Sequence, residues 1–122
     1  MRNFMIILIL SGFTILSSWT GVAFGHAMPN NTEPKVGETV NASPKQVRIW
    51  FDSPLKPAIS TILVQNTSGR QVDKGDGQVD SSDATLLGVS LPLLPPGTYR
   101  VIWNVVASDG HQTEGEYSFN IK

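Results

Sequence analysis

The two histidines of this chain stand where each could bind a metal ion. His26 follows an apolar leader, and cleavage of the chain after Gly25 would make it the first residue, with its imidazole beside a free α-amine. The amine nitrogen and the imidazole Nδ1 can then close a chelate ring on one ion, because an amine with a pKa of about 8 readily loses its proton to a strong Lewis acid. A terminal histidine therefore supplies two donors, whereas an internal histidine supplies one.

The second histidine lies in the sequence S-D-G-H, where Asp109 and His111 are two residues apart. In an extended chain their side chains point to the same side, so that a carboxylate oxygen and an imidazole nitrogen could bind one ion. The Asp-Gly pair is equally typical of a tight turn, between a strand that ends near Val106 and one that begins near Thr113. A kinked start of the second strand would satisfy both interpretations.

These groups form a set of three nitrogens and one oxygen, contributed by His26, Asp109 and His111. Such a set suits tetragonal Cu(II), which lies at the peak of the affinity order of divalent metals. Zn(II) could bind the same donors, but it prefers a tetrahedral array. The chain has no Cys, and Met28 is its only Met after residue 25, so no soft cluster for Cu(I) can form. We therefore predict one Cu(II) per chain.

Residues 1–25 have the features of a secretory signal peptide. Arg2 gives a positively charged start, residues 4–16 are mostly apolar, and Ala23 and Gly25 are the small residues that a signal peptidase requires. A membrane anchor is the alternative, but Ser and Gly residues interrupt the apolar run and keep it below the roughly 20 residues that span a bilayer. The sequence thus predicts an exported protein, periplasmic, or extracellular if the cell has a single membrane.

Residues 26–122 have the length of one small domain. Without Cys this domain carries no disulfide, and its stability has to come from an apolar core. The net charge of the chain is −1, with no basic run. This balance argues against binding to nucleic acid or to anionic lipid.

The elements that would position the histidines are short strands, because apolar and polar residues alternate and helical periodicity is absent after residue 25. The clearest alternation runs through three segments, 46–51, 98–106 and 116–122. Two further strands are expected at 58–65 and 84–91, and a weak edge strand at 71–79. Turns rich in Pro, Gly, Asn and Asp separate them. About seven strands of this length predict an all-β, immunoglobulin-like β-sandwich of two antiparallel sheets.

Three aromatic residues could form a binding platform, but two of them are in phase with apolar neighbours. Tyr99 and Trp103 alternate with Val101 and Val105, which predicts that they lie in the core. Trp50 is out of phase with its strand and is expected near the surface or under the N-terminal segment. Four aspartates between residues 73 and 83 lack the spacing of a calcium loop and are interpreted as a solvated loop.

Several motifs of this sequence resemble those of the CopC-type copper-resistance family of exported copper-binding domains. They are a signal peptide that ends directly before His, E-P-K-V-G at 33–37, S-P-K-Q-V-R-I-W-F at 43–51, L-P-P-G-T-Y-R-V-I-W-N-V-V-A-S-D-G-H at 94–111, and a closing G-E-Y-S-F-N-I. The resemblance covers essentially all of residues 26–122. Its most specific part is the long ordered motif that ends in S-D-G-H.

The resemblance implies a Greek-key β-sandwich that binds one Cu(II) through the amine and imidazole of His26, the carboxylate of Asp109 and the imidazole of His111. It also implies a monomeric, non-enzymatic carrier for copper buffering, resistance or delivery, with a membrane copper importer of the CopD type as a partner. Two departures stand out. The segment 64–79 has no Met, which favours a protein for Cu(II) only, and Ser53 stands where some relatives have Glu, which leaves Asp52 as a weak substitute.

Two other functional classes remain open from the sequence. A terminal histidine chelate with a second histidine resembles the histidine brace of copper monooxygenases, although Asp109 would complete an in-plane set of four and leave only weak axial positions. In the other class the domain is a plain interaction module, and both histidines are incidental. Such a module predicts no thermal stabilisation by Cu(II).

Overall fold

The computed structural model describes residues 27–122 of the chain. The predicted signal peptide, residues 1–25, and His26 lie outside the described residues. Within residues 27–122, no helix has the length and the apolar character that are needed to cross a membrane.

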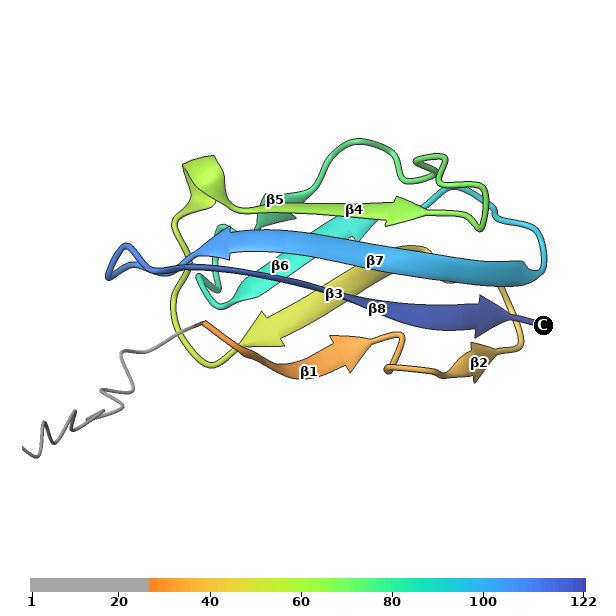
Figure 1. Ribbon diagram of the computed structural model, residues 1–122, viewed down its shortest axis with the longest axis horizontal. Helices are drawn as coiled ribbons and strands as arrows, with labels where there is room; N and C mark the ends of the chain where they lie inside the picture. The colour runs from red at the N-terminus through yellow and green to blue at the C-terminus, as the bar shows by residue number, and fades with distance from the viewer. Residues whose placement is uncertain (1–26) are drawn as a thin grey trace, which may run out of the picture.

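The described chain forms two four-stranded sheets that pack face to face, as the two layers of Figure 1 show. The first sheet has the order β1 (Pro29–Glu33), β3 (Gln46–Phe51), β6 (Leu86–Ser90), β5 (Gln78–Val79), and the second has the order β2 (Thr39–Val40), β8 (Gln112–Ile121), β7 (Gly97–Val106), β4 (Thr61–Gln65). Strand pairs are antiparallel except β2 and β8, which are parallel. The predicted immunoglobulin-like β-sandwich is confirmed, with eight described strands instead of about seven.

The core is built by the alternation that the sequence shows. Every second residue of β3 is buried, and the inward stripe of β7 is Tyr99, Val101, Trp103 and Val105, as predicted. Burying one large aliphatic or aromatic side chain contributes about 1.5–3 kcal/mol to folding. Because the two stripes face each other across the sandwich, a single core holds both sheets together.

The structure differs from the sequence prediction at several strand ends. The segment 57–59 forms a 3-10 turn that begins at Pro57, so β4 begins only at Thr61. β8 begins at Gln112, one residue before the start near Thr113 that the turn predicted and four residues before its clearly alternating segment, and it includes Gly115. A side chain at residue 115 would stand 2.4 Å from Cζ2 of Trp103, so the strand passes the indole only because it has Gly there. The strands β1 and β2 were not predicted.

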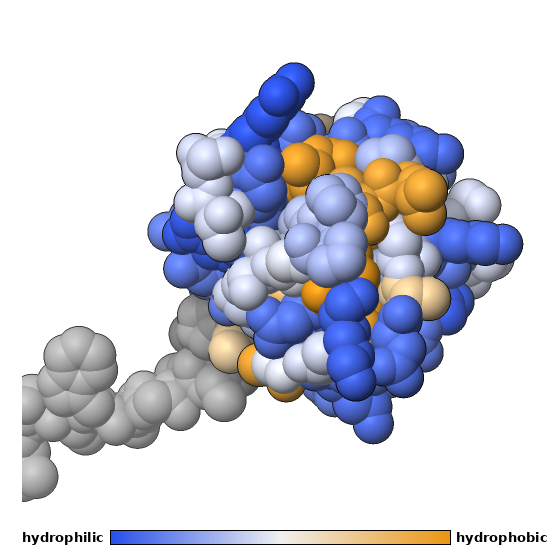
Figure 2. All heavy atoms as spheres, turned by 90° about the vertical axis from the view of Figure 1, so that its right-hand side faces the viewer, coloured by the Kyte–Doolittle hydropathy of each residue, from blue (hydrophilic) through white to orange (hydrophobic). Residues whose placement is uncertain are grey.

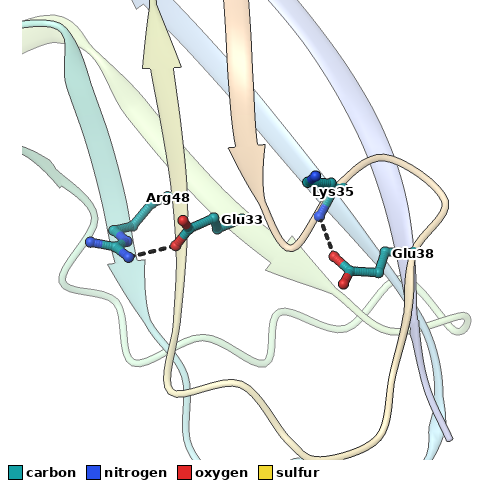
Figure 3. A network of polar contacts seen from close by, with 4 residues as sticks. All are labelled: Glu33, Lys35, Glu38 and Arg48. Carbon is teal, nitrogen blue, oxygen red and sulfur yellow. Dashed lines mark hydrogen bonds and ion pairs between the residues drawn. The ribbon is translucent and has the colours of Figure 1, made fainter.

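Polar contacts attach the end of β1 to β3 and close the loop between β1 and β2 (Figure 3). The guanidinium of Arg48 on β3 forms an ion pair with Glu33 at the end of β1, and the backbone N–H of Lys35 donates to Oε2 of Glu38 at 2.7 Å. The guanidinium of Arg48 also lies 5.0 Å from the centre of the Trp50 ring. Trp50 is half-buried in this way, on the outer face of the sheet, as predicted for a residue near the surface.

The four aspartates of the predicted solvated loop bind backbone amides of that region. They accept hydrogen bonds from the N–H groups of residues 64, 75, 82, 85 and 90, at 2.7–3.0 Å; the acceptors are Asp73, Asp76, Asp80 and Asp83. Hydrogen bonds from Ser90 and Ser82 lower the pKa of Asp76 and of Asp80. These carboxylates therefore shape the loop, which the sequence interpretation did not anticipate.

Candidate metal centre

Three segments of the described chain meet at one end of the sandwich, on the left of Figure 1. They are the first described residues, 27–28, the segment 52–56 after β3, and the turn 107–111 between β7 and β8. Lys56 N–H donates to the carbonyl of Val106 at 2.8 Å, and Ser108 N–H donates to the carbonyl of Pro54 at 2.9 Å. The turn is thus fixed to the first sheet as well as to its own hairpin. We call this end of the molecule the histidine end.

The S-D-G-H motif forms the turn of the long β7–β8 hairpin. Ala107 N–H donates to the carbonyl of His111 at 2.9 Å, and Gly110 N–H donates to the carbonyl of Ala107 at 2.8 Å. Gly110 has a φ of +95°, a conformation that favours glycine because it has no Cβ. The predicted Asp-Gly turn is therefore confirmed, and Asp109 and His111 do not lie in an extended strand.

The turn brings the predicted carboxylate and imidazole together. Backbone N–H of His111 donates to Oδ1 of Asp109 at 3.0 Å, and Nδ1 of His111 lies 3.1 Å from Oδ2 of Asp109. The first contact is the local side-chain turn that aspartate commonly forms with the residue two positions later. Both side chains are 41% exposed, although the Nδ1 atom of His111 is itself buried.

The separation of these two atoms fits a shared metal ion. Two donors bound at right angles, each roughly 2.0 Å from an ion, lie about 2.8 Å apart. The observed 3.1 Å between Nδ1 and Oδ2 requires only a small adjustment to reach this value. Within residues 27–122, no third His, Cys, Asp or Glu gathers with this pair.

The remaining predicted ligand, His26, lies outside the described residues. The structure does describe its neighbour, Ala27, whose side chain is fully buried in the core and whose carbonyl accepts a hydrogen bond from Oγ1 of Thr113 at 2.8 Å. Thr113 is the second residue after His111. The described chain thus begins against the same hairpin that carries the Asp109–His111 pair.

Asp52, which the sequence left as a weak substitute ligand, contacts the backbone of this first segment. Its Oδ1 accepts a hydrogen bond from Met28 N–H at 2.8 Å, and its own N–H donates to the carbonyl of Met28 at 3.0 Å. Ser53 Oγ lies 3.4 Å from the same Oδ1. Thr113 was missed altogether, because nothing in its spacing connects it to a residue 86 positions earlier.

Apolar residues are buried where β3 and β7 reach the histidine end. Phe51, the last residue of β3, contacts the edge of the Trp103 ring with 5.3 Å between ring centres, and Val105 and Ala107 are buried beside them. This packing helps to fix the end of β3, which Asp52 directly follows.

The sequence and the fold were compared with those of known proteins. The family model described as the CopC domain matches residues 30–122. Protein YobA of Escherichia coli strain K12 is 29% identical over 104 residues, which cover 84% of each protein. Copper resistance protein C of Xanthomonas campestris pv. juglandis is 30% identical over 106 residues, which cover 82% of this chain and 83% of that protein.

Solved structures give the same result. The crystal structure of CopC from Methylosinus trichosporium OB3b has a TM-score of 0.71 and 32% identity, and covers 80% of this chain and 94% of that one. PcoC, a methionine-rich copper resistance protein from Escherichia coli, has a TM-score of 0.68 and 27% identity, and covers 80% of this chain and 99% of that one. A family model that spans nearly all described residues, with a matching fold, shows that this chain belongs to the CopC family.

Proposed function

We propose that the exported, processed chain binds one Cu(II) through the amine and imidazole of His26, the carboxylate of Asp109 and the imidazole of His111. In this role it buffers copper, contributes to copper resistance, or delivers the ion to a membrane copper transporter. The observation that carries the proposal is the 3.1 Å approach of Nδ1 of His111 to Oδ2 of Asp109 at the end where Ala27 is docked.

Covalent geometry supports the participation of His26. Consecutive Cα atoms are about 3.8 Å apart, so docking of Ala27 restricts the space in which residue 26 can lie. The Ala27 carbonyl is bound by Thr113, at the start of the strand that follows His111. Cleavage after Gly25 would then place an amine and an imidazole close to the Asp109–His111 pair.

The composition of the chain supports Cu(II) over Cu(I). Met28 is the only Met of residues 27–122, and the chain has no Cys, whereas one structural relative is described as methionine-rich. Nitrogen and oxygen donors suit Cu(II), and thioether and thiolate donors suit Cu(I). A Cu(II)-only protein is therefore the proposal that the side chains of this domain favour.

A binding role, without catalysis, follows from the same ligand set. Two donors of His26 with Asp109 and His111 would fill a square plane around Cu(II), and a metal that activates a substrate needs an open position. Two relatives are known as copper resistance proteins. We propose a periplasmic or extracellular location, a monomeric state, and a membrane importer of the CopD type as the partner.

The test is a Cu(II) titration of correctly processed protein. The full chain is expressed in a host that exports it, and mass spectrometry establishes that the product begins at His26. Binding should saturate at one Cu(II), with weak d–d absorption, a type 2 paramagnetic spectrum, and a rise in melting temperature. At a free Cu(II) concentration one thousand times Kd the stabilisation is about 4 kcal/mol. Processed protein that binds no Cu(II) contradicts the proposal.

Variants of the ligands make the titration specific. His111→Ala and Asp109→Ala should each weaken binding, while Asp80→Ala, which removes a carboxylate that binds Ser82 in a remote loop, should not. If the protein instead used the ion catalytically, it would form peroxide in the presence of copper and a reductant. The rate of peroxide formation would then be much higher in the unsubstituted protein than in His111→Ala. That result would replace the carrier proposal with the copper-oxidase alternative.

A further inference from the structure

We propose that Asp52 and Thr113 are positioning residues that together fix the amino terminus for metal chelation. The inference rests on the proposed function, because it assigns a role to contacts that lie directly after the proposed terminal ligand. Neither side chain is proposed to touch the ion. Each holds the backbone of one residue, Met28 or Ala27; Asp52 directly follows β3 of the first sheet, and Thr113 lies in β8 of the second.

The contact between Asp52 and Met28 extends the β1–β3 ladder in an unusual way. In a hydrogen-bonded antiparallel pair, the two residues normally exchange two backbone N–H···O=C bonds. Here Asp52 N–H donates to the carbonyl of Met28 at 3.0 Å, but Met28 N–H donates at 2.8 Å to the Asp52 side chain. The second bond of this pair therefore depends on the residue type at position 52, which an ordinary ladder does not require.

The neighbouring residues make this contact important for the start of the chain. Pro29 has no N–H to donate, and the register of β1 against β3 shifts between Pro29 and Asn31. The regular ladder is thus interrupted directly after Met28. Chain ends that nothing ties down are poorly ordered, and the bond from Met28 N–H to Asp52 is one of the contacts that tie this end down.

Thr113 provides the matching contact from the second sheet. Its Oγ1 donates to the carbonyl of Ala27 at 2.8 Å, and the Ala27 side chain is fully buried in the core. Two consecutive residues are therefore held from opposite layers, Met28 by the end of β3 and Ala27 by the start of β8. Holding points on two sides restrict both the position and the direction of the chain that leaves Ala27.

This restriction should matter for copper because a preorganised ligand does not have to be ordered by the ion. Residues that orient metal ligands through hydrogen bonds typically change metal affinity by about 10–100-fold when they are replaced. The same mechanism predicts that Asp52→Ala and Thr113→Val weaken Cu(II) binding by about 10–100-fold. It also predicts a broader, heterogeneous paramagnetic spectrum, since the terminal donors then sample several arrangements.

The experiment measures Cu(II) affinity by competition with a chromophoric chelator, on exported protein that begins at His26. Asp52→Asn keeps an oxygen acceptor for Met28 N–H, and Thr113→Ser keeps the hydroxyl, so both should bind close to the level of the unsubstituted protein. Asp76→Ala is the matched control: Asp76 accepts a hydrogen bond from Ser90 N–H at 2.8 Å, outside the three segments of the histidine end. It loses the same charge and the same kind of bond, and its affinity should be unchanged.

A second background separates positioning from general effects on charge or folding. When one Gly is inserted before His26, the terminal chelate is lost, and Asp52→Ala should then weaken Cu(II) binding no further. Melting curves without copper identify any variant that fails to fold. The proposal is overturned if Asp52→Ala binds as tightly as Asp76→Ala, or if Asp52→Asn is as weak as Asp52→Ala.

Hydrogen exchange of the copper-free protein tests the contact independently of the metal. The Met28 amide should be protected in the unsubstituted protein and in Asp52→Asn, and should exchange fast in Asp52→Ala. If the processed protein binds no Cu(II), the proposed function fails while the exchange data still decide whether Asp52 orders the terminus. Fast exchange of this amide in the unsubstituted protein rejects the positioning role.

Discussion

The two ends of the sandwich hold different parts of the chain. At the histidine end, side chains of Asp52, Thr113 and Asp109 bind backbone groups of other residues. The opposite end, which faces the viewer in Figure 2, carries the C-terminus and exposes apolar residues among hydrophilic ones. Leu93 is 92% exposed there, at the rim of an open hollow that Leu94, Pro95, Pro96 and Ile121 also line. We call it the apolar end.

Side chains bind backbone groups at both ends, and the ends differ in what is held: the first described residues at the histidine end, and the proline-rich connection before β7 at the apolar end. At the apolar end, prolines fix φ by their rings, and the hydroxyl of Tyr99 donates to the carbonyl of Pro95 at 2.6 Å. At the histidine end, the chain is positioned by individual side chains that can be replaced one at a time. A substitution there should change the geometry of the proposed ligands, whereas a substitution at the apolar end should leave that geometry unchanged.

Extension of the chain by one residue should separate the two ends most strongly. A Gly inserted before His26 turns the proposed amine donor into an amide, and should lower Cu(II) affinity by at least about a hundredfold, which is the upper range for loss of a supporting residue. A Gly added after Lys122, at the apolar end, should leave affinity unchanged. Titration of both proteins checks this, and equal loss in the two would contradict the assignment of the terminus.

Gly115→Ala should damage the packing under the histidine end. The new Cβ would stand 2.4 Å from Cζ2 of Trp103, whose ring contacts Phe51. Overpacking of this kind typically costs about 1–3 kcal/mol, and chemical denaturation measures it. Gly88→Ala is the control, because the nearest atom to its new Cβ would be the carbonyl oxygen of Val47, at 3.4 Å. An unchanged free energy of unfolding in Gly115→Ala would mean that the Trp103 ring moves aside without cost.

A pH titration should reveal the buried tyrosine that lies between the ends. Burial strongly raises the pKa of Tyr117. Below the ordinary tyrosine pKa of about 10 both the folded and the unfolded chain keep this proton, but at higher pH the unfolded chain loses it first. The free energy of unfolding should therefore fall as pH rises above about 10. Tyr117→Phe should reduce that slope, and an identical slope in the variant would contradict it.

Leu93→Ser should have the smallest effect. Its side chain is almost fully exposed, so the free energy of unfolding should change by less than about 0.5 kcal/mol. Leu94, the next residue, is buried, and Leu94→Ala should cost roughly 2–5 kcal/mol. Cu(II) affinity should be unaffected in Leu93→Ser. A large loss of copper binding in this variant would show that the two ends are coupled.

The sequence predicted those strands whose side chains alternate between the core and the outside. The strand β3 was found with its observed bounds, and β7 to within one residue. In contrast, β1 reads P-N-N-T-E and β2 has two residues, so neither carries an apolar period. β1 is a strand because β3 offers it a partner, together with the ion pair of Arg48 and Glu33.

The candidate site was predictable only where its residues are close in sequence. The spacing of Asp109 and His111 indicated that they act together, and the structure joins them through a turn instead of an extended strand. The contacts of Thr113 with Ala27 and of Asp52 with Met28 span 86 and 24 positions. Such contacts follow from the docking of separate elements, and no local pattern in a single sequence encodes them.

The burial of Ala27 has a consequence for the maturation of this protein. A peptidase acts on accessible, extended chain, but the folded domain encloses the residue that lies second after the predicted cleavage point. We therefore expect the leader to be removed before this methyl group enters the interior. In the proposed function, premature closure of the domain would protect the bond from cutting and leave a precursor without the proposed terminal amine, so the order of folding and cleavage would decide whether the proposed ligand forms.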